Sequence, residues 1–291
     1  MSVIYLDGEF VASHEATVSV FDHGLLYGDG VFEGIRAYNG RVFRLEEHIR
    51  RLFDSAKAII LDIGMSQAEV CAAVVETCRR NEIRDGYIRV VVTRGPGDLG
   101  LDPRKCSKPT VFVIAAAIQL YPERCYTEGL RVVTCATRRN HPQALDPSIK
   151  SLNYLNNILA KIEVNRAGAD EGLMLNAEGW VAEATGDNIF VMRDGQIYTP
   201  PVAAGCLRGI TRDTVIELAQ AAGLPLVEEF FSLHFVYTAD EIFLTGSAAE
   251  VVPVTNVDER VIGDGRPGPI SRQLVDLYRD YVANNGTPIG T

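Results

Sequence analysis

The segment Pro147-Ser148-Ile149-Lys150-Ser151-Leu152-Asn153-Tyr154 joins a β-like run over residues 130–137 to a helix predicted over residues 151–167. Only five of the 28 lysines and arginines are lysines, and Lys150 is one of them. Its neighbours are apolar or small and polar, so its amine would be partly desolvated and able to act as a nucleophile that forms a Schiff base. From this segment alone, an ordinary surface lysine remains the alternative.

The composition is that of a globular protein and argues against several classes of partner. The 291 residues, 47% hydrophobic and 23% charged, suffice for two domains. A net charge of −10 disfavours nucleic acid and acidic membranes, and no apolar run approaches the ~18 residues of a membrane span. The first eight residues lack the features of a secretion signal. The six cysteines form no Cys-x-x-Cys pair and lie apart from the five histidines, so we expect free thiols, no metal site and a cytoplasmic location.

Turn signals divide the chain into hairpins and helices. Glycine-centred turns predict antiparallel hairpins at Asp7-Gly8, Asn39-Gly40, Glu178-Gly179 and Asp194-Gly195. Apolar spacing and capping residues predict helices over 45–59, after a capping box at 66–69, over 211–222 and over 271–283. Buried strands are predicted over 87–93, 110–118 and 130–137. This mixture indicates an α+β fold rather than a Rossmann sheet, with a small N-terminal domain (1–118), a linker (119–128) and a larger domain (129–291).

Three further segments are candidates for a pyridoxal phosphate site, which also needs a lysine. Residues 207–213 enter a helix near Thr211, whose free N–H groups suit a phosphate, although Thr211 could simply cap the helix. Residues 244–250 form a small-residue turn that could offer further donors or be only a tight turn. Glu183 could keep a pyridine nitrogen protonated, with a rim carboxylate as the alternative.

Six motifs in a common order carry a resemblance to a known family. They are Tyr27-Gly28-Asp29-Gly30-Val31-Phe32-Glu33-Gly34-Ile35-Arg36, His48-Ile49-Arg50-Arg51-Leu52, Lys150-Ser151-Leu152-Asn153-Tyr154, the run 183–188, Gly209-Ile210-Thr211-Arg212-Asp213 and Gly246-Ser247-Ala248-Ala249-Glu250. Over essentially its whole length the chain resembles the class IV (fold type IV) pyridoxal phosphate aminotransferases, above all the branched-chain-amino-acid aminotransferases. The resemblance implies two domains, the smaller an N-terminal α/β sandwich and the larger a pseudo-barrel.

The resemblance implies a role for each motif at the cofactor pyridoxal 5'-phosphate. Lys150 would form the Schiff base and then carry the proton between the substrate α-carbon and the cofactor. Glu183 would pair with the pyridine nitrogen, and Tyr154 with the phenolic oxygen of the ring. The remaining cofactor residues would hold the phosphate or line the cofactor: Arg51, Asn188, Leu207, Gly209, Ile210, Thr211, Gly246 and Ser247.

The resemblance also implies the substrate class, a branched-chain L-amino acid with 2-oxoglutarate as its partner. Glycine at position 34 would leave room for a bulky aliphatic group. Arg36, Arg89 or a nearby arginine would accept the second carboxylate of glutamate. The full set expected to bind the substrate is Tyr27, Phe32, Gly34, Arg36, Tyr87, Arg89, Leu101 and Ala248. Core packing is the alternative for Phe32 and Tyr87.

Partners and rival activities follow from the same resemblance. The loop 95–101 resembles the family loop that reaches into the neighbouring subunit, which implies a homodimer as the minimal unit, and hexamers occur in the family. A D-amino-acid or (R)-amine transaminase of the same fold is the alternative activity. A D-specific relative would typically have an Arg-x-His pair, whereas this chain has Arg94-Gly95-Pro96. A catalytically dead binding protein is disfavoured because Lys150 and Glu183 are both present.

Overall fold

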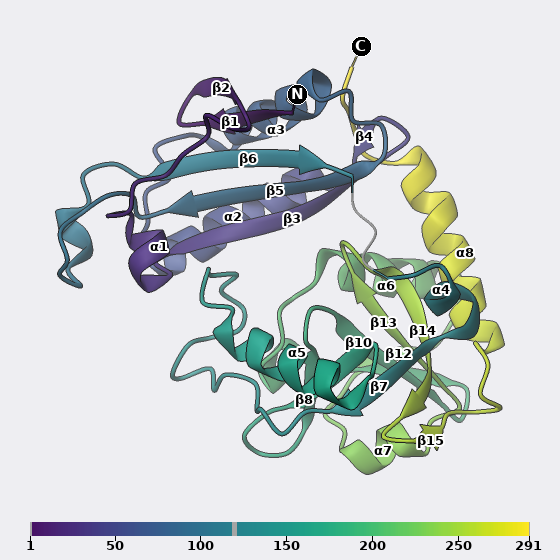
Figure 1. The fold of residues 1–291 in the computed structure, drawn as a ribbon. Coiled ribbons are helices and arrows are strands. Elements are labelled where there is room, and N and C mark those ends of the chain that lie inside the picture. The colour runs from purple at the N-terminus through teal and green to yellow at the C-terminus, as the bar shows by residue number, and fades with distance from the viewer. Residues whose placement is uncertain (1, 118–120, 291) are drawn as a thin grey trace. The chain divides into compact units, whose positions relative to one another are not determined.

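The computed structural model describes residues 2–117 and 121–290, which divide into two compact units (Figure 1). Unit 1 comprises Met1–Ile118, Ile149–Asn153 and Val282–Thr291, and unit 2 comprises Gln119–Ser148 and Tyr154–Tyr281. The division is therefore more interleaved than the expected one, because the short segment that carries Lys150 and the C-terminal residues belong with the N-terminal part of the chain.

Unit 1 is built on an antiparallel sheet with the strand order β16-β4-β3-β5-β6-β1-β2 in the described residues. Its strands are β1 (Val3–Leu6), β2 (Glu9–Ala12), β3 (Gly30–Tyr38), β4 (Arg41–Val42), β5 (Gly86–Thr93), β6 (Thr110–Ala116) and β16 (Thr287–Pro288). Its helices are α1 (His23–Tyr27), α2 (Leu45–Ala58), α3 (Gln67–Arg80) and the 3₁₀ turn η1 (Pro103–Lys105).

The core of unit 1 lies where α2 and α3 cover one face of this sheet (Figure 1). Side chains alternate along a strand, so Val31 and Ile35 of β3 point into the core with Ile49 and Leu52 of α2. The helix forms because its apolar residues recur every three or four positions. The same alternation places Phe32, Gly34 and Arg36 on the opposite face of the sheet.

Unit 2 contains a larger mixed sheet with the order β12-β11-β10-β13-β14-β7-β8-β9, to which β15 adds beside β14. Its strands are β7 (Leu130–Thr134), β8 (Glu171–Leu175), β9 (Val181–Ala184), β10 (Asn188–Arg193), β11 (Gln196–Thr199), β12 (Leu226–Glu228), β13 (Glu241–Gly246), β14 (Glu250–Val257) and β15 (Arg260–Val261). Its helices are α4 (Arg124–Glu128), α5 (Leu155–Ala167), α6 (Ile210–Ala221), α7 (Leu233–Tyr237) and the 3₁₀ turn η2 (Val202–Ala204). Helix α8 (Pro269–Asn284) begins in unit 2 and ends in unit 1.

Most local predictions are confirmed. Strand pairs β1–β2, β3–β4, β8–β9 and β10–β11 are antiparallel and meet at the four predicted turns. The capping box at Ser66 is present at the start of α3, with Glu69 as its second member. The α+β class is confirmed as well. Among the described residues, no helix combines the length and apolar character needed to cross a bilayer.

Two predictions about element bounds are wrong. The helix expected from Ser151 begins at Leu155, because residues 150–152 instead hydrogen-bond to β3 and Ser151 forms an antiparallel bridge with Val31. The strand expected over 130–137 ends at Thr134. The expected linker 119–128 includes α4, whose Cys125 is buried in the core of unit 2. Ile118, the end of the strand expected over 110–118, lies outside the described residues, and β6 ends at Ala116.

Candidate active site

Lys150 is held in unit 1 by backbone hydrogen bonds to β3. The Phe32 N–H donates to the Lys150 carbonyl at 3.0 Å, and the Leu152 N–H donates to the Gly30 carbonyl at 2.9 Å. On the other side, the Lys150 N–H donates to the hydroxyl of Ser55, a buried residue of α2, at 3.1 Å. The Lys150 ammonium lies 4.6 Å from the centroid of the Phe32 ring. A strand edge and a helix therefore fix this lysine, and its amine lies against an aromatic face.

The expected substrate residues of β3 and β5 share the face of the sheet that points away from α2 and α3. Gly34 pairs with Arg89 and Arg36 pairs with Tyr87 across the two strands. The Arg89 guanidinium carbon lies 4.5 Å from the Phe32 ring centroid and 5.4 Å from that of Tyr87. This face thus combines aromatic surface with positive charge.

The glycine at position 34 has a role different from the expected one. A Cβ added there would lie 1.9 Å from the Tyr87 hydroxyl oxygen. The space above Gly34 is therefore already taken by Tyr87 rather than left open for a substrate side chain. The absence of a side chain at 34 is what lets the Tyr87 hydroxyl lie over β3.

Arg51 projects from α2 and is oriented by a buried carboxylate that the sequence reasoning did not assign. Glu33 accepts from Arg51 Nε and Nη2 at 2.7 and 2.8 Å and from His48 Nδ1 at 2.7 Å. Burial raises the pKa of Glu33, but the charges of Arg51 and His48 outweigh it and hold the pKa well below its usual range. Burial lowers the pKa of His48 in spite of Glu33. The feature of the sequence that could have identified Glu33 is an acidic residue at an inward-facing position of a strand.

Tyr27 and Leu101 lie at the loop that follows β5. The Tyr27 hydroxyl donates to the Leu99 carbonyl at 2.5 Å, and the His23 ring nitrogen Nε2 lies 2.8 Å from the Asp98 carbonyl. Helix α1 thereby anchors the loop. The Leu101 side chain, in contrast, is 77% exposed and makes no part of the aromatic face on β3 and β5.

In unit 2, Glu183 is buried on β9 and both of its oxygens are held. Arg139 Nε donates to Oε1 at 2.6 Å, and the Leu207 N–H donates to Oε2 at 3.0 Å. Arg139 is itself buried and also donates to Asn156 Oδ1 at 3.0 Å. Sequence reasoning missed Arg139, because its partner lies 44 residues away along the chain. Held by these donors, the Glu183 carboxylate is a fixed, charged acceptor of the kind that a protonated ring nitrogen requires.

The N-terminus of α6 presents backbone N–H groups without a side-chain cap. Gly209 is the N-cap, so the alternative in which Thr211 caps this helix does not hold, and no side chain makes a capping hydrogen bond to the first turn. A Cβ on Gly209 would lie 2.1 Å from Asn188 Oδ1, and Asn188 Nδ2 donates to the Leu207 carbonyl at 2.9 Å. Asn188 thus fixes the entry to the helix, whose open N–H groups at Ile210 and Thr211 suit an anion.

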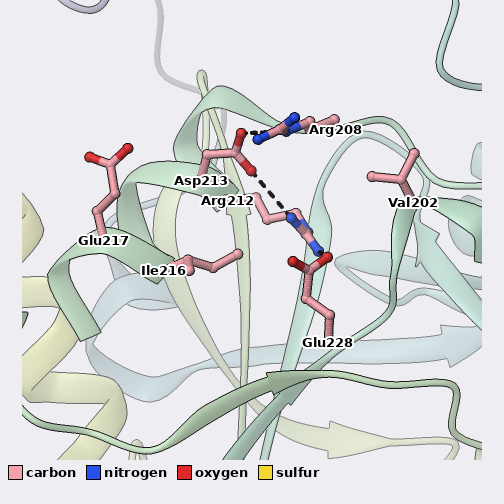
Figure 2. A pocket seen from close by; sticks show the side chains of 7 residues that line it. All are labelled: Val202, Arg208, Arg212, Asp213, Ile216, Glu217 and Glu228. Carbon is pink, nitrogen blue, oxygen red and sulfur yellow. Dashed lines mark hydrogen bonds and ion pairs between the residues drawn. The ribbon is translucent and has the colours of Figure 1, made fainter. Parts of the chain in front are cut away.

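The charged residues of the motif 207–213 line a pocket of about 360 Å³ beside α6 (Figure 2). Arg212 is buried, donates to Glu228 Oε2 at 2.5 Å and pairs with Asp213 at 3.2 Å. Arg208 also pairs with Asp213, at 2.8 Å. Figure 2 shows these side chains directed toward one another. The charges of this motif therefore tie α6 to β12 rather than extend the anion site.

The other predicted unit 2 residues lie at two turns. Gly246 ends β13 and leads into Ser247 and Ala248 before β14. Tyr154 is the residue immediately before α5. The structure thus gathers the predicted residues into two sets. Unit 1 holds Lys150, Arg51, Tyr27, Phe32, Gly34, Arg36, Tyr87, Arg89 and Leu101, and unit 2 holds Tyr154, Glu183, Asn188, Leu207, Gly209, Ile210, Thr211, Gly246, Ser247 and Ala248.

Comparison with known proteins extends over nearly the whole chain. The profile of the family described as amino-transferase class IV matches residues 30–257. The branched-chain-amino-acid aminotransferase of Pseudomonas aeruginosa is 43% identical over 289 residues, covering 97% of this chain and 93% of that protein. The crystal structure of the Escherichia coli branched-chain amino acid aminotransferase superposes with a TM-score of 0.95 at 33% identity, covering 98% and 96% of the two chains. A second crystal structure, of a branched-chain amino acid aminotransferase with pyridoxamine 5'-phosphate, gives a TM-score of 0.93 at 40% identity, covering 97% and 94%. The chain belongs to the class IV aminotransferases.

Proposed function

We propose that this protein is a pyridoxal 5'-phosphate-dependent branched-chain-amino-acid aminotransferase. It exchanges the amino group of leucine, isoleucine or valine with 2-oxoglutarate, giving the branched 2-oxo acid and L-glutamate in two half-reactions. The observation that carries the proposal is Lys150, which is hydrogen-bonded to β3 and whose amine lies against the Phe32 ring. The chain also aligns over nearly its whole length with enzymes of this name. A cytoplasmic location agrees with its six free cysteines.

The described residues fit a phosphorylated pyridine cofactor. The uncapped first turn of α6 suits a phosphate, and the glycines at 209 and 246 stand where a Cβ would collide with Asn188 and Asp187. When bound, the cofactor supplies the electron sink that makes the substrate α-proton acidic. We propose that the Ile210 and Thr211 amides, the Ser247 hydroxyl and Arg51 hold its phosphate, and that Gly246 lets the backbone approach.

Two side chains are proposed to control protons at the cofactor and the substrate. Lys150 Nζ would hold the cofactor and, once the substrate amine has displaced it, would take the proton from the substrate α-carbon and deliver it to the cofactor. Glu183 keeps the pyridine nitrogen protonated, and Arg139 and the Leu207 N–H hold that carboxylate in a single orientation. Tyr154 orients the ring through its phenolic oxygen. Asn188 and Gly209 act by shaping the entry to α6, with Leu207 beside the ring.

Substrate recognition is assigned to the outward face of β3 and β5. Phe32 and Tyr27 supply apolar surface for an aliphatic side chain, and the Tyr87 hydroxyl with the Ser247 and Ala248 amides receives the α-carboxylate. Arg36 and Arg89 lie on the same face as Phe32 and supply positive charge for the second carboxylate of glutamate.

A second copy of the chain is the proposed protein partner. Helix α5 exposes the apolar side chains of Leu155, Ile158, Leu159 and Ile162, a stripe at helical spacing. Unit 1 exposes Leu25 of α1 and Leu101 of the loop that α1 anchors. Exposed apolar stripes of this kind mark interfaces. A homodimer in which Leu101 reaches the neighbouring subunit's substrate accounts for both surfaces.

The first experiment is the visible absorption spectrum of the purified protein with pyridoxal phosphate, before and after separate additions of L-leucine and D-alanine. The lysine-bound cofactor band should be lost with L-leucine only, and Lys150→Ala should show neither the band nor turnover. Loss with D-alanine only would favour the D-amino-acid transaminase. A protein that stays colourless with added cofactor would rule out the proposal.

A further inference from the structure

Unit 2 contains a buried cluster of polar side chains to which no role has yet been assigned. Glu171 of β8 and Asp187, in the turn between β9 and β10, are 3% and 5% exposed. The hydroxyl oxygen of Tyr121 lies 3.0 Å from Glu171 Oε2 and 2.9 Å from Asp187 Oδ2. One phenol therefore bridges two carboxyl groups that lack access to water.

Counting protons shows which carboxyl is neutral. A phenol has one hydrogen, so it can donate to only one of the two groups, and the other must donate to the phenol oxygen. Glu171 accepts from the Lys161 ammonium at 2.8 Å, from the Gly172 and Thr185 N–H groups at 2.9 and 3.0 Å, and from the Thr185 hydroxyl. Those donors belong to a carboxylate. The hydrogen-bond partner of the Asp187 carboxyl among the described residues is Tyr121 alone, so Asp187 carries the proton.

The charged surroundings of Asp187 favour its neutral form. Burial and the negative charge of Glu171 raise the pKa of Asp187 to about 7, with Glu183 adding to this and Tyr121 and Lys161 opposing it. The same burial, with both carboxyls, raises the pKa of Tyr121, so the phenol stays protonated. Asp187 therefore titrates near neutrality while the phenol of Tyr121 stays protonated.

Asp187 also touches the turn that is proposed to bind anionic groups. A Cβ on Gly246 would lie 1.9 Å from Asp187 Oδ1, so the carboxyl packs on the backbone just before Ser247. The next residue, Asn188, pairs with Thr245 of β13. The Ala184 N–H donates to the Asp187 carbonyl at 2.8 Å and closes the turn that follows Glu183.

We propose that Asp187 is a titratable positioning residue, whose neutral form supports the 246–248 turn and whose ionised form weakens the binding of anionic groups there. Ionisation would put a buried negative charge against the turn, next to the cofactor phosphate and the substrate carboxylate. It would also remove the hydrogen bond from Asp187 to Tyr121. Both effects act through electrostatics at short range in a poorly solvated site. The inference rests on the proposed function for the identity of the anions.

The test compares cofactor binding by the wild type and Asp187→Asn. The dissociation constant for pyridoxal phosphate is measured for each apoprotein between pH 6 and 8.5, and the ratio of the two constants cancels the titration of the cofactor itself. An asparagine amide can still donate to Tyr121 but cannot ionise. We expect the ratio of the wild-type constant to that of the variant to be near one at pH 6 and to rise to roughly tenfold by pH 8.5 as wild-type binding weakens. Asp194→Asn, the same change at an exposed turn, should leave the ratio to wild type at one throughout.

Two further measurements strengthen the test. Glu171→Gln removes a negative charge that faces Asp187, so Asp187 should ionise more readily. The pH at which the binding of pyridoxal phosphate weakens should therefore be lower in this variant than in the wild type. Infrared difference spectra of the wild type should show a protonated carboxyl stretch that disappears as the pH rises through 7 and is missing in Asp187→Asn.

The inference is overturned if the ratio stays constant with pH, whether at one or at a higher value, since a constant loss would mean a purely structural role. A wild type that binds no pyridoxal phosphate even at pH 6 would instead refute the proposed function.

Discussion

At the residue scale, the buried charges near the site come in groups whose members hold one another in place. Glu33 illustrates this, because a lone carboxylate at a fully buried position would be neutral. Its three charge-assisted contacts from Arg51 and His48 keep it ionised and leave Arg51 in a fixed orientation. The orientation of Arg51 is therefore set by its contacts within the group of Glu33, His48 and Arg51 and not by the arginine alone.

Replacing Glu33 by glutamine should destabilise the protein by about 3 kcal/mol at neutral pH, since Arg51 loses its buried counter-charge. The folded-state pKa of Glu33 is below the unfolded value of 4.5, so its stabilising contribution is complete above that value and is lost as the pH falls through the folded pKa. The gap between wild type and Glu33→Gln should thus be widest above pH 5 and narrow in acid.

Urea unfolding of the apoprotein at fixed concentration from pH 4 to 7 measures this gap. Glu46→Gln, at an exposed position in the first turn of the same helix, is the matched control and should change stability little. Equal effects of the two substitutions would contradict the role assigned to Glu33.

At the element scale, the pairing of β3 with its neighbours decides what each strand presents. β5 and residues 150–152 both hydrogen-bond to β3. A slip of one residue would exchange the two faces of a strand and bring Glu33 to the outward face. The register therefore places the lysine, the aromatic surface and the arginines together.

Gly34→Ala tests this register directly. The added Cβ would lie 1.9 Å from the Tyr87 hydroxyl and must displace it. We expect KM for L-leucine to rise roughly tenfold, about 1.4 kcal/mol, because Tyr87 is proposed to bind the α-carboxylate. The dissociation constant for pyridoxal phosphate, measured on the same variant, should stay within about twofold and serves as the internal control. An unchanged KM would mean that Tyr87 does not contact the substrate.

At the scale of the whole molecule, each unit has its own core, and the exposed apolar residues lie on both units. α5 illustrates the point, because its buried residues pack on unit 2 while Leu155 and Ile158 remain exposed. A helix with apolar residues on two sides can bury one side against its own unit, and a partner is needed to cover the other.

The double variant Leu155→Glu with Ile158→Glu should convert the proposed homodimer to a monomer with little activity. Light scattering coupled to size-exclusion chromatography measures the mass, and the rate with L-leucine and 2-oxoglutarate measures the consequence. Val261→Glu adds a charge at an exposed valine of β15 and should leave both quantities unchanged. A double variant that keeps the wild-type mass would place the subunit contact elsewhere.

Much of the local structure could be predicted because its causes are local. The Asp194-Gly195 turn adopts positive φ at both residues, a conformation that those residue types tolerate, and Ser66 caps α3 through a residue three positions away. Lys150 could be singled out for a similar reason, since its neighbours in sequence are apolar.

The sequence by itself determined the class of fold, the hairpins and the starts of most helices, and it singled out Lys150 as the candidate lysine. Only the tertiary structure decided that 150–152 hydrogen-bonds along β3, that Arg139 holds Glu183, and that Tyr121 bridges Glu171 and Asp187. The partners in these contacts lie between 44 and 122 residues apart, from Arg139 and Glu183 to Gly30 and Leu152. No local preference encodes such pairs, because each exists only when the register of the sheets and the burial of the charges are satisfied together.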